Sequence, residues 1–142
     1  MMMIILRKET EQIKKDEGFK SKPYYDSEGY LSIGYGLNLD NGITKDEADL
    51  LCSMRVANAY GDLWKVFTKE TADYLAYKDP ERAGVFVNML YNLGSARFNT
   101  FRRMIAAVER KDWETASKEL LDSKYARQVG HRALRLAERL RG

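Results

Sequence analysis

The sequence predicts an α+β protein in which a small antiparallel sheet lies between an N-terminal helix and a larger helical body. Three observations predict it: an amphipathic helical stretch opens the chain, strand-like segments with turn residues follow over 22–36, and capped helical segments fill the rest. No repeat or low-complexity tract interrupts this order. At 142 residues the chain is long enough for one domain with a real core.

The first helix is predicted over roughly 6–17. Leu6, Thr10, Ile13 and Glu17 are spaced at i, i+4, i+7 and i+11, so they share one stripe of the helix. Gly18 occupies the position of the left-handed residue that commonly ends a helix. We therefore expect Glu17 to continue the apolar stripe and to face the protein or a cleft.

Residues 22–36 are predicted to form two or three short antiparallel strands. Tyrosine, leucine and isoleucine flank the run Asp26-Ser-Glu-Gly29, which has the composition of a hairpin turn. Ser32 alternates with apolar neighbours, so its side chain is expected on the opposite face from theirs. A second turn is predicted at Asp40-Asn-Gly42. A sheet this small must pack on helices to be stable.

From Thr44 onward every predicted element is a helix. Thr44 and Glu47 match a capping box, Thr68 can cap the next helix, and Asp79-Pro80 places proline at a first helical position. Gly94 is expected to end the helix that begins at Pro80. Further helices are predicted around 100–110, 112–121 and 131–141.

We expect a single domain over 1–142, with a helix and sheet lobe at about 1–43 and a linking helix and helical lobe at about 44–142. The one cysteine, Cys52, cannot form an internal disulfide and is expected to be buried on the long helix. Met1–Leu6 is apolar but too short for a signal-peptide core or a membrane span. These features predict a protein made in the cytosol, without stable membrane association. A monomer is the default expectation, since the sequence does not indicate an oligomeric state.

The net charge of +3 is unevenly distributed. Residues 123–142 hold six Lys and Arg against one acid, which gives +5 and leaves −2 for the rest of the chain. Such a helix can follow an anionic polymer such as nucleic acid, teichoic acid or peptidoglycan, or it can be an ordinary solvated face. Composition does not separate these two interpretations.

Glu17, Asp26 and Ser32 form the most informative group of polar residues. Hydrolysis of a glycosidic bond needs one carboxylic acid that keeps its proton and one ionised carboxylate. An acid beside an apolar wall keeps its proton more readily, because desolvation disfavours the charged form. That description fits the position predicted for Glu17, whereas Asp26 in a hydrated turn is expected to stay ionised, and Ser32 could hold a water against it. Taken singly, each residue is more often structural, so the hypothesis depends on their combination.

The spacing of these three residues resembles the signature of the phage-type lysozymes of T-even coliphages, glycoside hydrolase family 24. That signature is Glu, eight residues, Asp, five residues, Thr, and this chain has Glu17, eight residues, Asp26, five residues, Ser32. The similarity continues in order through nearly the whole chain, in the segments Gly42–Ala48, Asn88–Gly94, Phe98–Met104, Lys111–Trp113 and Ser123–Arg132.

The resemblance implies a lysozyme-like fold, in which a small antiparallel hairpin lobe is joined by a long helix to a larger helical lobe. It also implies a muramidase without a cofactor, which cuts the β-1,4 bond between N-acetylmuramic acid and N-acetylglucosamine in peptidoglycan. In this family Glu17 would be the general acid, Asp26 would activate water, and Ser32 would take the place of the threonine that positions that water. Inversion at the anomeric carbon would follow.

The resemblance further implies that Arg132 pairs with the acid from the helical lobe, and that Asn38, Tyr91 and Asn92 contact substrate. An endolysin of a phage or prophage is the expected role. Such an enzyme waits in the host cytoplasm and reaches the wall in the periplasm through a holin-type pore.

Three departures from the family pattern are visible. Serine in place of threonine keeps the hydroxyl but loses the methyl group that restricts the rotamer, so the anomeric outcome stays open. Leu37 stands where the family has a histidine. The segment after Gly36 is short, which predicts a smaller sheet lobe and a shallower cleft.

Other functions were weighed against a hydrolase. A lytic transglycosylase needs only one acid, and a wall-binding homologue with weakened catalysis would fit the departures at Ser32 and Leu37. A nucleic-acid-binding module would leave the spacing of the acids unexplained. The lone His131 has no partner at metal-ligand spacing, so no metal site is predicted. Trp64 and Trp113 are expected in the core.

Overall fold

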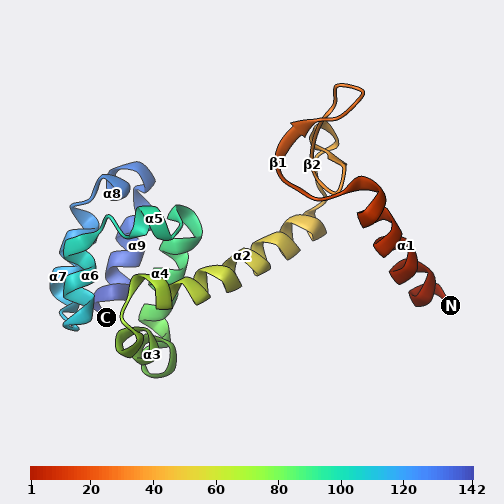
Figure 1. The fold of residues 1–142 in the computed structure, drawn as a ribbon. Helices are drawn as coiled ribbons and strands as arrows, with labels where there is room; N and C mark the ends of the chain where they lie inside the picture. The colour runs from red at the N-terminus through yellow and green to blue at the C-terminus, as the bar shows by residue number, and fades with distance from the viewer. The chain divides into compact units, whose positions relative to one another are not determined.

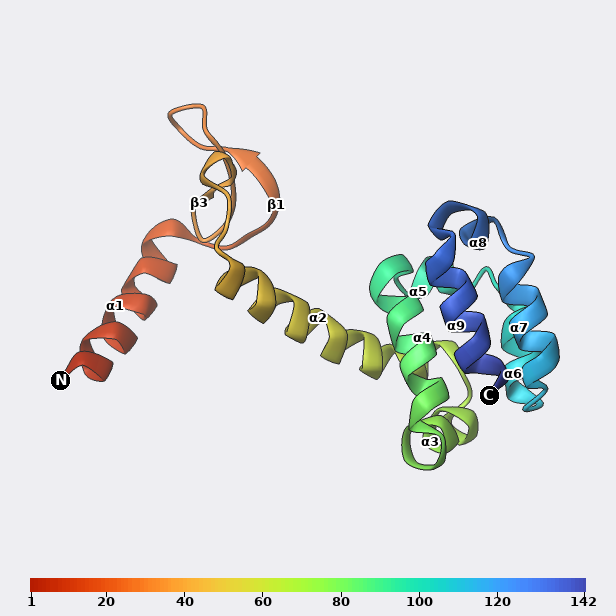
Figure 2. The ribbon, with the colours of Figure 1, turned by 180° about the vertical axis from the view of Figure 1, so that it is seen from behind.

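The computed structural model describes all 142 residues, which divide into two units, Met1–Asp49 and Leu50–Gly142. The predicted α+β class is confirmed: the chain has nine α-helices and one three-stranded antiparallel sheet (Figures 1 and 2). The division between the units falls inside helix α2 (Lys45–Val66). None of the helices combines the length and the hydropathy that crossing a membrane requires.

The N-terminal unit consists of one helix, the sheet and a short 3-10 turn. Its elements are α1 (Met2–Glu17), β1 (Lys20–Tyr25), β2 (Leu31–Gly34), β3 (Leu37–Asn38) and η1 (Leu39–Asn41). The strands follow one another in the order β1-β2-β3, and the hairpin turn lies where the sequence predicted it. Gly18 has φ of +69° and ends α1, which confirms its predicted role.

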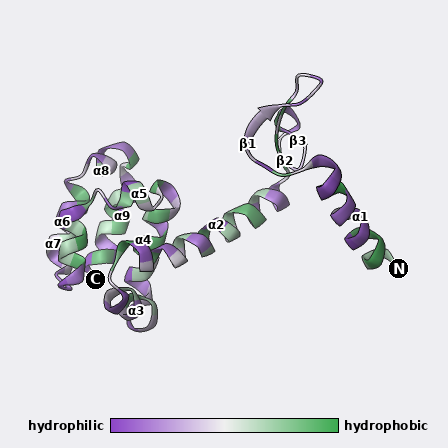
Figure 3. Cartoon of the chain, viewed as in Figure 1, coloured by the Kyte–Doolittle hydropathy of each residue, from purple (hydrophilic) through white to green (hydrophobic).

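Helix α1 departs from the prediction in one respect. The stripe of Leu6, Thr10, Ile13 and Glu17 was expected to face the protein, but no residue of α1 is buried in this structure. Leu6 is 57% exposed and Ile13 is 51% exposed. Figure 3 shows that the first turn of α1 is apolar and that most of the remaining helix is hydrophilic. The expectation that this stripe faces the protein is therefore wrong within the N-terminal unit, because no element of that unit covers it.

The C-terminal unit contains most of α2 and seven further helices. These are α3 (Lys69–Lys78), α4 (Pro80–Leu93), α5 (Ser95–Phe98), α6 (Arg102–Glu109), α7 (Trp113–Leu121), α8 (Lys124–Val129) and α9 (His131–Arg141). Two of them, α5 and α8, were not predicted. Each has six residues or fewer, too few for a hydrophobic period to be recognised. Helices α6, α7 and α9 lie side by side in both views of the ribbon (Figures 1 and 2).

The predicted helix caps are confirmed by hydrogen bonds. The Thr44 N–H donates to the Glu47 carboxylate, and the Glu47 N–H donates to the Thr44 hydroxyl, as in a capping box. Thr68 accepts from a backbone N–H in the first turn of α3, and Asp79 does the same for α4. His131 begins α9, as predicted.

The apolar core lies in the C-terminal unit, because every buried apolar side chain is at Ala59 or beyond it. At its centre Phe67, Phe86 and Phe98 meet edge to face, with ring centroids between 5.0 and 6.1 Å apart. Trp64 and Trp113 are partly buried and pack against this cluster, as predicted. The Trp64 indole N–H also donates to the Asp73 carboxylate at 2.8 Å.

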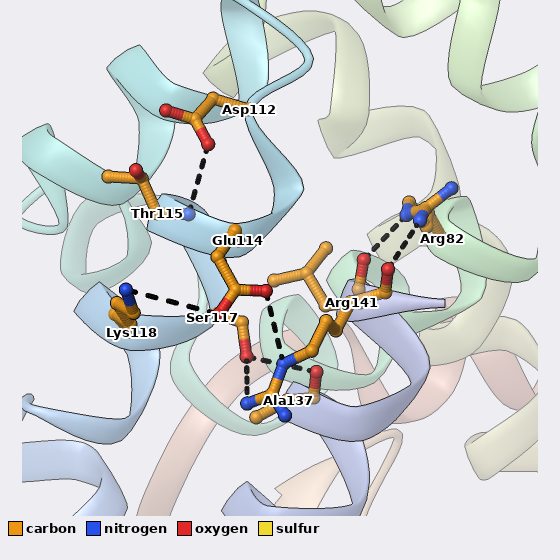
Figure 4. Close-up of polar contacts among 9 residues, drawn as sticks. Arg82, Asp112, Glu114, Thr115, Ser117, Lys118, Ala137 and Arg141 are labelled. Carbon is orange, nitrogen blue, oxygen red and sulfur yellow. Dashed lines mark hydrogen bonds and ion pairs between the residues drawn. The ribbon is translucent and has the colours of Figure 1, made fainter.

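The end of α9 is held by polar contacts (Figure 4). Arg82 donates to the backbone oxygens of Leu140 and Arg141, forms an ion pair with Asp79, and lies over the Trp113 ring at 4.5 Å from its centroid. These contacts satisfy carbonyls that a helix end leaves without partners.

Glu109, in the last turn of α6, joins α6 to the start of α3. Its carboxylate accepts hydrogen bonds from the Thr68 N–H, the Thr68 hydroxyl and the Thr71 hydroxyl, at 2.9, 2.8 and 2.5 Å. Burial acts to raise the pKa of Glu109, but the hydrogen bonds from Thr71 and Thr68 together outweigh it, so the pKa lies below its ordinary value of 4.5. The folded state therefore favours the ionised carboxylate.

We predict that Glu109→Gln lowers the free energy of unfolding at neutral pH by about 1 kcal/mol, because bonds to a charged acceptor are replaced by bonds to a neutral one. Since the folded pKa is depressed, this contribution is complete above the ordinary value of 4.5 and is lost as the pH falls through the folded pKa. Denaturant unfolding of both proteins at several pH values tests this. A difference that is constant down to strongly acidic pH would contradict it.

Candidate active site

Glu17 is the last residue of α1, and its side chain lies against the turn that joins β2 to β3. A Cβ atom built on Gly36 would stand 2.5 Å from Glu17 Oε2 and 2.9 Å from its Cδ. Gly36 also has φ of +72°, a conformation that residues with a side chain rarely adopt. A side chain at position 36 would therefore adopt an unfavourable φ and would displace the Glu17 carboxylate from the space it fills.

Asp26 directly follows β1 and closes the hairpin turn. Its Oδ1 accepts from the backbone N–H groups of Glu28 and Tyr30, both at 2.9 Å, and its own N–H donates to the Tyr30 carbonyl. This is the local pattern by which aspartate stabilises a turn. Oδ2 has no hydrogen bond to the protein, so one oxygen is fixed in place while the other stays free to accept a proton.

Ser32 lies on the central strand β2 and is only 2% exposed. Its hydroxyl donates to the Tyr30 carbonyl at 3.4 Å, a long hydrogen bond. The backbone of Tyr30 therefore contacts both residues, since its N–H binds Asp26 and its carbonyl accepts from Ser32. The role of Tyr30 could not be predicted from its side chain, because its contribution comes from the main chain.

The predicted residues divide between the two units. Glu17, Asp26, Ser32 and Asn38 belong to the N-terminal unit, where Asn38 is the cross-strand partner of Ser32. Glu17 itself is exposed, so the apolar wall expected beside it is absent from that unit. Its carboxylate lies against Gly36.

Arg132, near the start of α9, is fixed by one residue of α4. Its Nε and Nη2 atoms donate to the side-chain oxygen of Asn88 at 2.9 and 2.7 Å, and Nη2 also donates to the Asn88 carbonyl at 3.2 Å. Bidentate contacts of this kind define the plane of a guanidinium. Asn88 is the first residue of the segment Asn88–Gly94, one of those that resemble the family. Its hydrogen bonds with Arg132 could not be deduced from spacing alone.

Tyr91 and Asn92, at the end of α4, are both exposed. A hydrogen bond with Cys52 is the largest cause that raises the pKa of Tyr91, whereas Arg55 and Arg132 act in the opposite direction. The prediction that Cys52 is buried is wrong, because the thiol is exposed on α2. A helical position alone does not show which face of α2 is covered.

The C-terminal unit also has a groove of about 590 Å³ between α5, α6 and α8. Its charged lining residues are Arg97, Arg102, Arg103, Glu119, Asp122 and Lys124. The Tyr125 hydroxyl is buried without a hydrogen-bond partner, and burial raises the pKa of this phenol. No group of three or more His, Cys, Asp or Glu side chains suited to a metal ion is present.

Comparison with known proteins identifies the family. The family model described as phage lysozyme matches residues 14–140. The chain belongs to the phage lysozyme family. It is 30% identical to probable T4-type lysozyme 1 of Dictyostelium discoideum, over 89% of each chain, and 24% identical to probable T4-type lysozyme 2 of the same organism, again over 89% of each.

A third relative belongs to a phage particle. The pre-baseplate central spike protein Gp5 of enterobacteria phage T4 is 28% identical, over 89% of this chain but only 26% of the length of Gp5. Membership of the phage lysozyme family makes the protein a glycosidase of the lysozyme type, whose general activity is muramidase-type lysis of the peptidoglycan wall.

The contact between Glu17 and Gly36 leads to a prediction. Gly36→Ala places a methyl group where the Glu17 carboxylate lies, so the side chain must rotate away and lytic activity should fall at least about 100-fold. Turbidity loss of a cell-wall suspension measures the effect. Gly29→Ala is a matched control, because Gly29 also has a positive φ of +86° but has open space around its Cβ position. Equal activity losses in the two variants would contradict the prediction.

Proposed function

We propose that this phage-type lysozyme hydrolyses the β-1,4 bond between N-acetylmuramic acid and N-acetylglucosamine, with Glu17 as general acid and Asp26 as general base. The observation that carries the proposal is the contrast between the two carboxyl groups. Glu17 lies against the Gly36 backbone, whereas Asp26 is fixed by two N–H groups through one oxygen only.

The two N–H groups hold one oxygen of Asp26 in place and leave the other to take a proton, which suits a base. In the proposed step Glu17 gives its proton to the leaving glycosidic oxygen as that bond breaks. Asp26 takes a proton from the water whose oxygen attacks the anomeric carbon. Ser32 accepts a hydrogen bond from that water, because its own proton is directed to the Tyr30 carbonyl. The result is inversion at the anomeric carbon.

Tyr91, Asn92 and Arg132 are proposed to bind the sugar chain. What supports this is their chemistry: an exposed phenol and an exposed amide on α4, and a guanidinium that Asn88 orients. A lytic transglycosylase would need no base, and its products would carry anhydro ends in place of reducing ends.

The biological setting proposed is that of a monomeric endolysin, which leaves the host cytoplasm through a holin-type pore and acts on the wall in the periplasm. The relative in the T4 baseplate spike supports a second role, as a lysozyme module associated with a phage particle. Sensitivity of lysis to deletion of the holin gene separates the two roles.

The two acids can be tested individually. We predict that Glu17→Gln lowers the rate of wall hydrolysis by at least about 1000-fold, and that Asp26→Asn lowers it by about 100-fold or more, while both variants keep the fold. Reducing ends released from purified wall give the rate, and circular dichroism checks folding. Glu11→Gln and Asp40→Asn are controls on exposed acids of the same unit. Wild-type turnover by either active-site variant would remove that acid from the mechanism.

The basic C-terminal segment yields a separate prediction, which depends on which of its cations take part in ion pairs. Arg139 pairs with Glu81 at 2.7 Å, and Arg141 contacts Glu114 and Ser117, so both serve the fold. Three exposed cations of this segment have no ion pair: Lys124, Arg127 and Arg135.

We expect the triple change of Lys124, Arg127 and Arg135 to glutamine to reduce lysis several-fold at low salt and little at high salt, because screening removes long-range attraction to the anionic wall. The matched control neutralises three exposed lysines elsewhere, Lys8, Lys15 and Lys78. If the triple variant lyses walls normally at low salt, this segment is merely solvated.

A further inference from the structure

A row of three polar side chains crosses the sheet on one face. Tyr24 of β1 is the cross-strand partner of Ser32 of β2, and Ser32 is in turn the partner of Asn38 of β3. Side chains of residues directly opposite one another in antiparallel strands lie on the same face, with Cβ atoms about 4.5–5.5 Å apart. Asp26 follows Tyr24 by two residues and so continues the same side of the chain.

The orientation of the Asn38 side chain is fixed. Its oxygen accepts from the Asp40 N–H at 2.9 Å and thereby caps the 3-10 turn η1. Because the oxygen is held by that N–H, the amide nitrogen must point the other way. Its two N–H groups have no hydrogen bond to the protein, and Asn38 is only partly exposed.

Ser32 is less firmly held than Asn38. Its hydroxyl makes one long hydrogen bond, at 3.4 Å, and serine lacks the second branch at Cβ that restricts χ1 in threonine. Because its proton is directed to the Tyr30 carbonyl, Ser32 can only accept a bond from water. Neither Ser32 nor an ionised Asp26 can donate a hydrogen bond to that water. Neither residue therefore orients the lone pairs of the water oxygen.

We propose that Asn38 is a positioning residue which donates an amide N–H to the attacking water; this inference rests on the proposed hydrolysis. Both hydrogens and both lone pairs of the water then have a partner. The water gives one hydrogen to Oδ2 of Asp26 and directs the other to Ser32, and it accepts from Asn38. One lone pair remains, and it points to the anomeric carbon. As the new bond to carbon forms, Asp26 takes the first proton and the leaving oxygen takes the proton of Glu17.

Asn38→Ser is the sharpest test, because serine can still cap η1 through its hydroxyl but has no amide. We expect kcat on purified peptidoglycan to fall about tenfold, the size of one neutral hydrogen bond, with KM and the melting temperature close to wild type. Asn38→Ala should lose kcat equally and also lower the melting temperature, because the cap is gone. Asn41→Ser, at an exposed asparagine in the same turn, should leave all three values unchanged.

Three outcomes for Asn38→Ser would overturn the proposal: an unchanged kcat, an effect confined to KM, or a loss of kcat that matches a loss of folded protein. An effect on KM alone would instead make Asn38 a sugar-binding residue. Failure of the proposed function is recognised separately, since the wild-type protein would then release no reducing ends at all.

Discussion

The carboxylate of Glu17 occupies the space that a side chain on Gly36 would need, and the proposed chemistry depends on this contact. The contact joins the end of a helix to the turn between two strands, so it places an acid beside the sheet that holds Asp26 and Ser32. It requires glycine with a positive φ at Gly36 and a helix that stops at Glu17, where Gly18 ends it. A shift of either end would move the proposed proton donor, Glu17, relative to the proposed base, Asp26.

Asp26 and Ser32 share a second constraint, the peptide groups of Tyr30. The N–H of Tyr30 holds one oxygen of Asp26, and the Tyr30 carbonyl takes the proton of Ser32. Asp26 is thereby left with one free carboxylate oxygen, and Ser32 is left with a hydroxyl lone pair. Both groups suit hydrolysis. Main-chain atoms set up this part of the site, and the role proposed for the Asn38 side chain is to add an amide donor.

Features that depend on residues close in sequence could be predicted. The capping box at Thr44, the caps at Thr68 and Asp79, and the helix end at Gly18 each involve atoms a few residues apart, and all are present in the structure. The order of helix, sheet and helical body follows from the same local signals. Helices α5 and α8 were missed because a helix of one or two turns has no clear hydrophobic period.

Features that depend on distant partners could not be predicted. Exposure of Cys52 depends on which face of α2 is covered, and the orientation of Arg132 depends on Asn88, 44 residues earlier in the chain. Arg139 belongs to the basic segment 123–142, but its ion pair with Glu81 joins residues 58 positions apart. For Glu17, the helical stripe predicted an apolar environment, whereas the structure shows an exposed acid against a glycine.

The configuration of the newly formed reducing end tests the central claim most directly, because it reports which face of the sugar the water attacks. NMR spectra recorded in the first minutes of hydrolysis of a defined peptidoglycan oligosaccharide, before mutarotation, give this configuration. General base catalysis by Asp26, with the water held by Ser32, predicts the α anomer from a β linkage. A β anomer, or an anhydro sugar end, would contradict the roles assigned to these residues.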